Sequence, residues 1–90
     1  LPVKVLLVED YAANALVAGT VLESFGYPYE IARDGEEALK KLAGGDYGVV
    51  LMDVEMQGMN GLETTARIRA LEEAEGRPHI PIIAMTAHAL

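Results

Sequence analysis

The chain has 90 residues, of which 51% are hydrophobic and 23% are charged, and its formal net charge is -7. This length accommodates one domain at most, and the composition predicts a packed globular chain. The acidic excess argues against nucleic acid or an anionic membrane surface as a direct partner. The chain has no cysteine, which excludes disulfides and thiolate metal sites and favours a cytoplasmic setting. No apolar run approaches the roughly 20 residues of a transmembrane helix.

The first elements predicted along the chain are a strand and a helix. Residues 3–8 (VKVLLV) form a short, nearly continuous apolar run with β-branched residues, which indicates a parallel strand buried on both faces. Residues 12–25 predict an amphipathic helix, because apolar residues recur there every three or four positions and Gly26 follows as a C-terminal cap. The recurring apolar residues are Val17, Val21, Leu22 and Phe25.

The same alternation follows in the next segment. Residues 29–32 predict a weaker second strand. Asp34, with Glu37 three residues later, resembles a capping box that opens a helix running through Leu42. The paired glycines Gly44 and Gly45 then close that helix.

A third strand, a loop and a third helix are predicted in the second half. Residues 47–52 (YGVVLM) repeat the buried-strand pattern and stop at Asp53. The segment 57–61 is rich in turn-forming residues, and Asn60 is placed to cap a helix over residues 61–74. The apolar side of this helix is expected to carry Leu62, Thr65, Ile68 and Leu71.

Pro81 opens a fourth predicted strand at residues 82–85. At the start of a strand, a proline costs no hydrogen bond between strands. Strands that alternate with helices in this way are typical of right-handed βαβ units. The expected fold class is therefore α/β, with a parallel sheet and helices on both faces.

Acidic and hydroxyl side chains stand where the predicted strands end. Glu9 and Asp10 follow the first strand, Asp53 ends the third, and Thr86 follows the fourth. Ligands of open parallel sheets bind beyond the carboxyl ends of the strands, so these side chains are expected to meet. Three carboxylates repel one another unless a cation binds between them, and Mg²⁺ is typically held by carboxylates together with phosphate oxygens. The pattern predicts a magnesium site suited to phosphate chemistry.

Asp53 is the best-placed nucleophile in this predicted site. A carboxylate at a strand end can attack a phosphoryl group and form an aspartyl phosphate. The hydroxyl of Thr86 could then hydrogen-bond a phosphoryl oxygen and move when the group arrives. His79 and His88 are assigned no catalytic role, because one lies in a turn and the other beyond a strand end.

Four segments together resemble the response regulator receiver domains of two-component signalling, and most closely those of hybrid sensor histidine kinases. The match spans the whole chain, and the order and spacing of its motifs make the resemblance specific. The segments are VKVLLVEDYAAN (3–14), DGxxAL (34–39), LMDVxMxxMxG (51–61) and PIIAMTA (81–87).

The resemblance implies a flavodoxin-like, doubly wound parallel sheet with strand order 2-1-3-4-5. Asp53 would accept a phosphoryl group from the phosphohistidine of a histidine kinase or a histidine phosphotransfer domain. Asp10 would bind Mg²⁺ directly, Glu9 largely through a water, and Glu55 by its backbone carbonyl, while Asp53 would be a third carboxylate ligand. Thr86 would be the switch hydroxyl, and the small Ala87 would leave room for the phosphoryl group. An output domain in the parent protein is a further possible partner.

The chain departs from the family pattern within the site. Tyr11 stands where many members have Asn or Asp, Gln57 replaces a usual Pro, and Asn60 replaces a common Asp. The loop around Gln57 is therefore expected to be more mobile than in other members.

The family continues through a helix, a fifth strand ending in a Lys, and a final helix, none of which this chain contains. Residues 1–90 are therefore expected to be the N-terminal part of a single, incomplete receiver domain, with strand order 2-1-3-4. The segment 80–87 would then be an uncovered edge strand. A trimmed parent, a homodimer or a domain swap would each account for this, and the sequence does not choose among them.

Two other functions compete with the phosphoacceptor reading. One is a degenerate receiver that acts only as an interaction module, which the missing Lys would favour if the natural protein ended at Leu90. The other is a Mg²⁺-dependent phosphohydrolase, in which a second Asp would be expected two residues after the nucleophile. That position is Glu55 here, and the chain contains no cap domain.

Overall fold

Four parallel strands and three helices make up the structure, a computed structural model that describes residues 3–86. The strands pair in the order β2-β1-β3-β4, which confirms the α/β class and the predicted strand order. The strands are β1 (Val5–Val8), β2 (Tyr29–Ala32), β3 (Val49–Asp53) and β4 (Ile82–Met85). The helices are α1 (Ala12–Ser24), α2 (Gly35–Gly44) and α3 (Gly61–Glu75).

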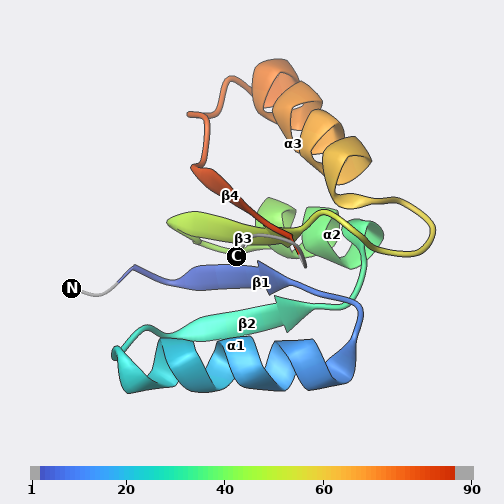
Figure 1. The fold of residues 1–90 in the computed structure, drawn as a ribbon. Helices are drawn as coiled ribbons and strands as arrows, with labels where there is room; N and C mark the ends of the chain where they lie inside the picture. The colour runs from blue at the N-terminus through green and yellow to red at the C-terminus, as the bar shows by residue number, and fades with distance from the viewer. Residues whose placement is uncertain (1–2, 87–90) are drawn as a thin grey trace.

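The helices cover the sheet from both faces (Figure 1). Helix α1 lies along one face near β2, while α2 and α3 pack against each other and against the other face. The main core forms between α2, α3 and the sheet, because alternate residues of β1 and β3 point toward these two helices. Its buried residues are Leu6, Val8, Ala32, Ala38, Val50, Met52, Met56 and Ile68.

The two predicted helix caps are present. The Asp34 side chain accepts a hydrogen bond of 2.7 Å from the N–H of Glu37, and Asn60 Oδ1 accepts one of 2.8 Å from the N–H of Glu63. The Glu37 carboxylate reaches back to the N–H of Arg33, one residue before the cap. These bonds satisfy N–H groups that have no partner within their helices, and so fix where α2 and α3 begin.

The predicted apolar side of α3 is confirmed at Ile68, which is buried, but is wrong for its two leucines. Leu62 is 70% exposed and Leu71 is 41% exposed, whereas Gly61, Thr64, Ile68 and Glu72 form the buried side. The small residues on the buried side explain why that side, and not the predicted one, faces the rest of the protein. A side chain at Gly61 would collide with the backbone of β3, and one at Gly35 would collide with Thr64, so α3 lies too close to its neighbours for large side chains there.

Helix α1 shows a similar departure from expectation. Its buried residues are Ala15 and Gly19, and a Cβ at Gly19 would meet the Tyr29 ring. Val17, Val21 and Phe25, which form most of the predicted apolar stripe, are 49% to 74% exposed. The helix therefore contacts the sheet through small residues, and its apolar stripe is left uncovered by the described residues.

Strand β4 forms one edge of the sheet, because it pairs only with β3 among the described residues. Ile83, in the middle of this strand, is 54% exposed. The predicted exposed edge is thus present at residues 82–85, a shorter segment than the 80–87 expected from the sequence.

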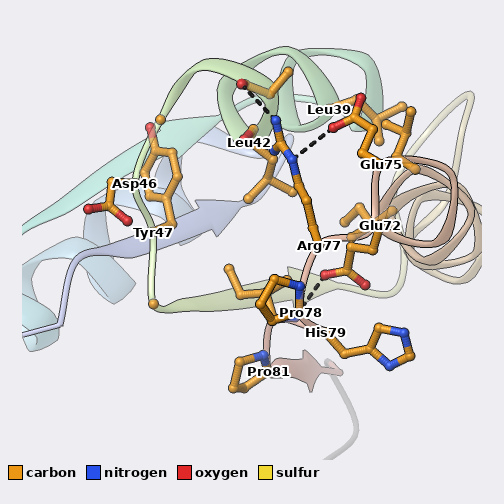
Figure 2. Close-up of a pocket in the computed structure, with 16 residues that line it drawn as sticks. Leu39, Leu42, Asp46, Tyr47, Glu72, Glu75, Arg77, Pro78, His79 and Pro81 are labelled. Atoms are coloured by element: carbon orange, nitrogen blue, oxygen red, sulfur yellow. Dashed lines mark hydrogen bonds and ion pairs between the residues drawn. The ribbon is translucent and has the colours of Figure 1, made fainter.

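A buried carboxylate joins α3 to the segment that leads into β4. Glu72 accepts a hydrogen bond of 2.7 Å from the N–H of Ile80 and one of 2.8 Å from Arg69, and its side chain is only 7% exposed (Figure 2). Burial raises the pKa of Glu72, but these hydrogen bonds outweigh it and hold the pKa below its usual value. At pH values above its ordinary pKa, Glu72 therefore stabilises the folded state. This contribution is lost as the pH falls through the lowered pKa.

Replacing Glu72 with Ala is expected to lower the free energy of unfolding by about 2 to 3 kcal/mol, because the N–H of Ile80 would lose its charged acceptor. Urea denaturation at neutral pH measures this loss. Glu73→Ala is the matched control, because Glu73 directly follows Glu72 on α3 with a side chain that is 74% exposed. Equal destabilisation by both substitutions would contradict the role given to Glu72.

A hollow of about 430 Å³ lies at the amino ends of β3 and β4, between the C-terminal ends of α2 and α3 (Figure 2). Two of its charged residues, Arg77 and Glu75, pair with each other. Arg77 bonds Glu75 at 2.7 Å and also donates to the carbonyls of Leu42 and Ala43 at the end of α2. Arg77 thus ties the two helix ends together across this hollow.

None of the helices in the described part of the chain is long and apolar enough to cross a membrane.

Candidate functional site

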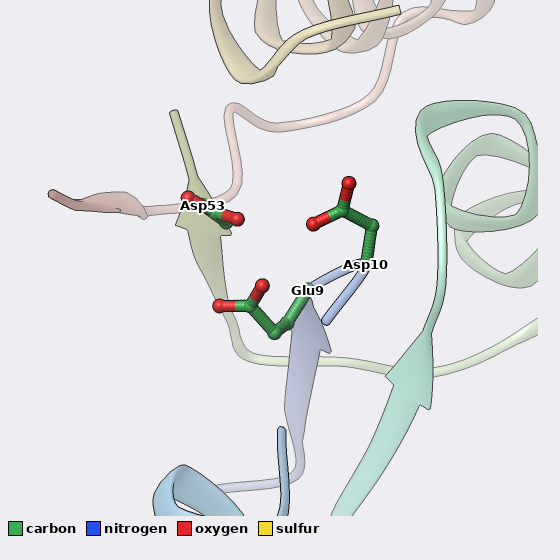
Figure 3. Close-up of side chains that lie close together, drawn as sticks. All are labelled: Glu9, Asp10 and Asp53. Atoms are coloured by element: carbon green, nitrogen blue, oxygen red, sulfur yellow. The ribbon is translucent and has the colours of Figure 1, made fainter. Parts of the chain in front are cut away.

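Three carboxylates meet at the carboxyl ends of β1 and β3. Glu9 and Asp10 directly follow β1, and Asp53 is the last residue of β3 (Figure 3). Each offers a carboxylate oxygen within 4.8 Å of the other two. Strands β1 and β3 are parallel neighbours, with Val8 opposite Met52, so the side chains that follow must converge. The structure therefore brings together the three acidic residues predicted from the strand ends.

Backbone N–H groups hold each of these carboxylates. Tyr11 N–H donates to Glu9 Oε2 at 3.1 Å, Glu55 N–H donates to Asp53 Oδ1 at 3.0 Å, and Gln57 N–H donates to Asp10 Oδ2 at 3.1 Å. One oxygen of each carboxylate is thus left without a hydrogen bond from the described residues. The cluster suits a cation, because each residue offers a carboxylate oxygen and Mg²⁺ and Ca²⁺ prefer oxygen ligands.

The three residues differ in burial. Glu9 and Asp53 are 6% and 9% exposed, whereas Asp10 is exposed. Burial raises the pKa of Glu9 to about 7, and the nearby carboxylates of Asp53 and Asp10 add to that effect against the hydrogen bond from Tyr11. The site therefore carries more negative charge than its surroundings stabilise. A divalent cation would remove that penalty.

The raised pKa of Glu9 predicts a specific pH dependence of stability without metal. The folded state holds a proton on Glu9 between its ordinary pKa of 4.5 and about 7, while the unfolded state releases it. Stability should therefore fall as the pH rises through this window, by about 3 kcal/mol at most. Urea denaturation in EDTA at pH 5 and pH 7.5 measures the loss.

The Glu9→Gln variant is the control for this prediction, because it cannot titrate. Its stability should change less between pH 5 and pH 7.5 than that of the wild-type protein. An identical change in both proteins would assign the pH dependence to other groups.

The remaining predicted site residues lie around this cluster or outside the described residues. Thr86 directly follows β4 and is exposed, and its neighbour Met85 pairs in register with Asp53. Glu55 lies in the loop after β3, where its N–H contacts Asp53. Ala87 lies outside the described residues.

Sequence reasoning missed two features beside the carboxylates. Arg33, at the end of β2, is exposed and lines an open hollow together with Asp10 and Tyr11. The second is the hydrogen bond from the Gln57 N–H to Asp10, which ties the loop to the site. The sequence gives only part of its signal: Gln57 has an N–H to donate, whereas the proline that is usual in the resembled family has none.

Known proteins resemble this chain over nearly its whole length. Residues 5–90 match the family described as response regulator receiver domain. The hybrid signal transduction histidine kinase I of Dictyostelium discoideum is 43% identical over 95 residues, which cover 100% of this chain. The chain spans 5% of that protein's length.

Solved structures agree with the sequence match. The N-terminal domain of a response regulator receiver protein from Methanoculleus marisnigri JR1 gives a TM-score of 0.86 at 34% identity, covering 98% of this chain and 69% of that one. A receiver domain of the response regulator Ssk1, crystallised with the histidine phosphotransfer protein Ypd1 of Saccharomyces cerevisiae, gives 0.80 at 28% identity. That match covers 94% of this chain and 62% of the other.

Proposed function

This chain belongs to the response regulator receiver family, and on that premise we propose that it accepts a phosphoryl group on Asp53 in a two-component phosphorelay. The observation that carries the proposal is the cluster of Glu9, Asp10 and Asp53, with oxygens within 4.8 Å of one another at the carboxyl ends of two strands. The domain would act as a switch more than as an enzyme, because the modified residue is its own.

The cluster fits a bound Mg²⁺. Its ligand atoms are carboxylate oxygens, one of which belongs to Glu9, whose pKa is raised by burial and by the neighbouring carboxylates. Asp10 and Asp53 would bind the ion directly, Glu9 largely through a water, and Glu55 through its backbone carbonyl. When bound, Mg²⁺ would neutralise charge on the phosphoryl oxygens.

Asp53 has the features of a nucleophile at this site. It is buried, and its Oδ1 accepts the Glu55 N–H. Oδ1 keeps a second lone pair that could hold the ion, so Oδ2 is free to attack. In the proposed step, Asp53 Oδ2 forms a bond to phosphorus while the bond between phosphorus and the donor's imidazole nitrogen breaks. The nitrogen keeps that electron pair, and the product is an aspartyl phosphate. The Ala87 position would leave space for the phosphoryl group.

The proposed donors are a histidine kinase or a histidine phosphotransfer domain. The receiver of Ssk1 is solved in complex with the histidine phosphotransfer protein Ypd1, which supports this class of partner. An output domain, or a second copy of the chain, would be a further partner. We also propose a cytoplasmic location, and that residues 1–90 are the N-terminal part of one receiver domain.

The experiment that tests the function is intact mass spectrometry after incubation with acetyl phosphate. The mass of one phosphate should be gained in Mg²⁺, and none should be gained in EDTA. Hydroxylamine should remove the phosphate, because it cleaves acyl phosphates. No gain in mass by the folded protein in Mg²⁺ would favour a phosphorylation-independent interaction module.

Thr86 is proposed as the switch that senses the phosphoryl group. Thr86→Ala should still be phosphorylated, but the phosphorylation-dependent change in hydrogen exchange of β4 and its neighbours should be reduced, because no hydroxyl can bond the phosphoryl oxygen. Thr86→Ser, which restores a hydroxyl, should recover the change. An unaltered response in Thr86→Ala would remove Thr86 from this role.

A further inference from the structure

The loop between β3 and α3 is tied to the end of β1 by a single hydrogen bond. The N–H of Gln57 donates to Asp10 Oδ2 at 3.1 Å, across 47 residues of sequence. Within residues 3–86, no other hydrogen bond joins loop residues 54–60 to the segment that follows β1. Asp10 is therefore the point at which this loop contacts the carboxylate cluster.

The bond depends on a residue type that departs from the family pattern. Gln57 stands where a proline is usual, and proline has no N–H to donate. Gln57 is exposed, and neither its amide nitrogen nor its amide oxygen bonds to the described residues. Its contribution to the site therefore comes from its backbone.

The hydrogen bond restrains the most exposed carboxylate of the cluster. Asp10 is the exposed member, and an exposed side chain loses rotamer freedom when it binds a ligand. Because Oδ2 is occupied by the Gln57 N–H, Oδ1 is the oxygen left for a cation. Partners of this kind fix the orientation of a metal ligand before the metal arrives.

We infer that Gln57 is a positioning residue, whose backbone N–H orients Asp10 for the divalent cation and couples cation binding to the loop. This inference rests on the proposed function, since it concerns the same Mg²⁺ site. The N–H also withdraws some negative charge from Asp10. Loss of the contact should nevertheless weaken binding, because partners that orient a ligand typically change metal affinity by about 10- to 100-fold.

Two substitutions at this position separate the backbone from the side chain. Gln57→Pro removes the N–H, and should raise the Kd for Mg²⁺ by at least about tenfold. Gln57→Ala removes the side chain but keeps the N–H, and should bind Mg²⁺ like the wild-type protein. Affinities are measured by titrating Mg²⁺ into ¹⁵N-labelled protein, followed by amide NMR signals without any phosphodonor.

A second measurement covers the case in which Gln57→Pro does not fold. In the metal-free protein, exchange of the Gln57 amide hydrogen should be slower than in Asp10→Ala, where its acceptor is gone. Equal exchange in the two proteins would overturn the inference, as would wild-type affinity in Gln57→Pro or an equal loss of affinity in Gln57→Ala. A wild-type protein that binds no Mg²⁺ would instead contradict the proposed function itself.

Discussion

The variant Asp53→Asn is expected to gain no phosphate from acetyl phosphate in Mg²⁺, while it keeps the wild-type fold. The amide cannot supply the carboxylate oxygen that attacks phosphorus. Its oxygen can still accept the hydrogen bond from the Glu55 N–H, so the turn after β3 should be retained. Intact mass spectrometry measures the loss of phosphate uptake, and circular dichroism checks the fold.

The same substitution should not destabilise the metal-free protein. Asp53 lies beside Glu9 and contributes to the raised pKa of that residue, so removing its charge relieves repulsion. The denaturation midpoint of Asp53→Asn at pH 7.5 in EDTA should equal or exceed that of the wild-type protein. Phosphate uptake at the wild-type rate by this variant would contradict the assignment of Asp53 as phosphoacceptor.

The parallel sheet and the meeting of the acidic residues could be predicted from the sequence. A short β-branched run that stops at a carboxylate locates both a strand and its end. In a parallel sheet all such ends lie on one edge, so Glu9, Asp10 and Asp53 had to converge. The caps at Asp34 and Asn60 were also predictable, because capping depends on local spacing. These predictions need no knowledge of how the elements pack.

The faces of the helices could not be predicted in the same way. Apolar spacing identifies α1 as a helix, but it does not reveal which residues meet the sheet. Ala15 and Gly19 make that contact because small residues permit a close approach, while the larger Val17 and Phe25 stay exposed. Burial of Glu72 was equally hidden, because its partner is the backbone N–H of Ile80 beyond the helix end.

Loop contacts were the other part that the sequence obscured. The loss of proline at position 57 predicts a more mobile loop if only chain flexibility is considered. The structure shows a hydrogen bond that opposes this effect, because the N–H of Gln57, which a proline would lack, donates to Asp10. Such a bond depends on the path of the loop across the sheet edge, which residue types alone do not specify.

Gly61→Ala is expected to destabilise the protein and to slow phosphorylation of Asp53. A Cβ at Gly61 would collide with the carbonyl oxygen of Asp53 and lie 2.7 Å from Val54 Cα, both of which are backbone atoms that cannot rotate away. The N–H of Gly61 also bonds the Val54 carbonyl at 3.1 Å, so the start of α3 is locked against the end of β3. To relieve the collision, either α3 or the end of β3 must move.

Overpacking of this kind costs about 3 kcal/mol of unfolding free energy, which urea denaturation measures. A shift of about 1 Å at Asp53 is also expected to slow phosphoryl transfer by about 100-fold. Intact mass spectrometry at successive times measures this rate. Gly44→Ala is the matched control. Gly44 ends α2, and no neighbouring heavy atom lies within 4 Å of an added Cβ, so this variant should keep both stability and rate. If Gly61→Ala behaved like Gly44→Ala, the close contact between α3 and the phosphoacceptor strand would not be needed to position Asp53.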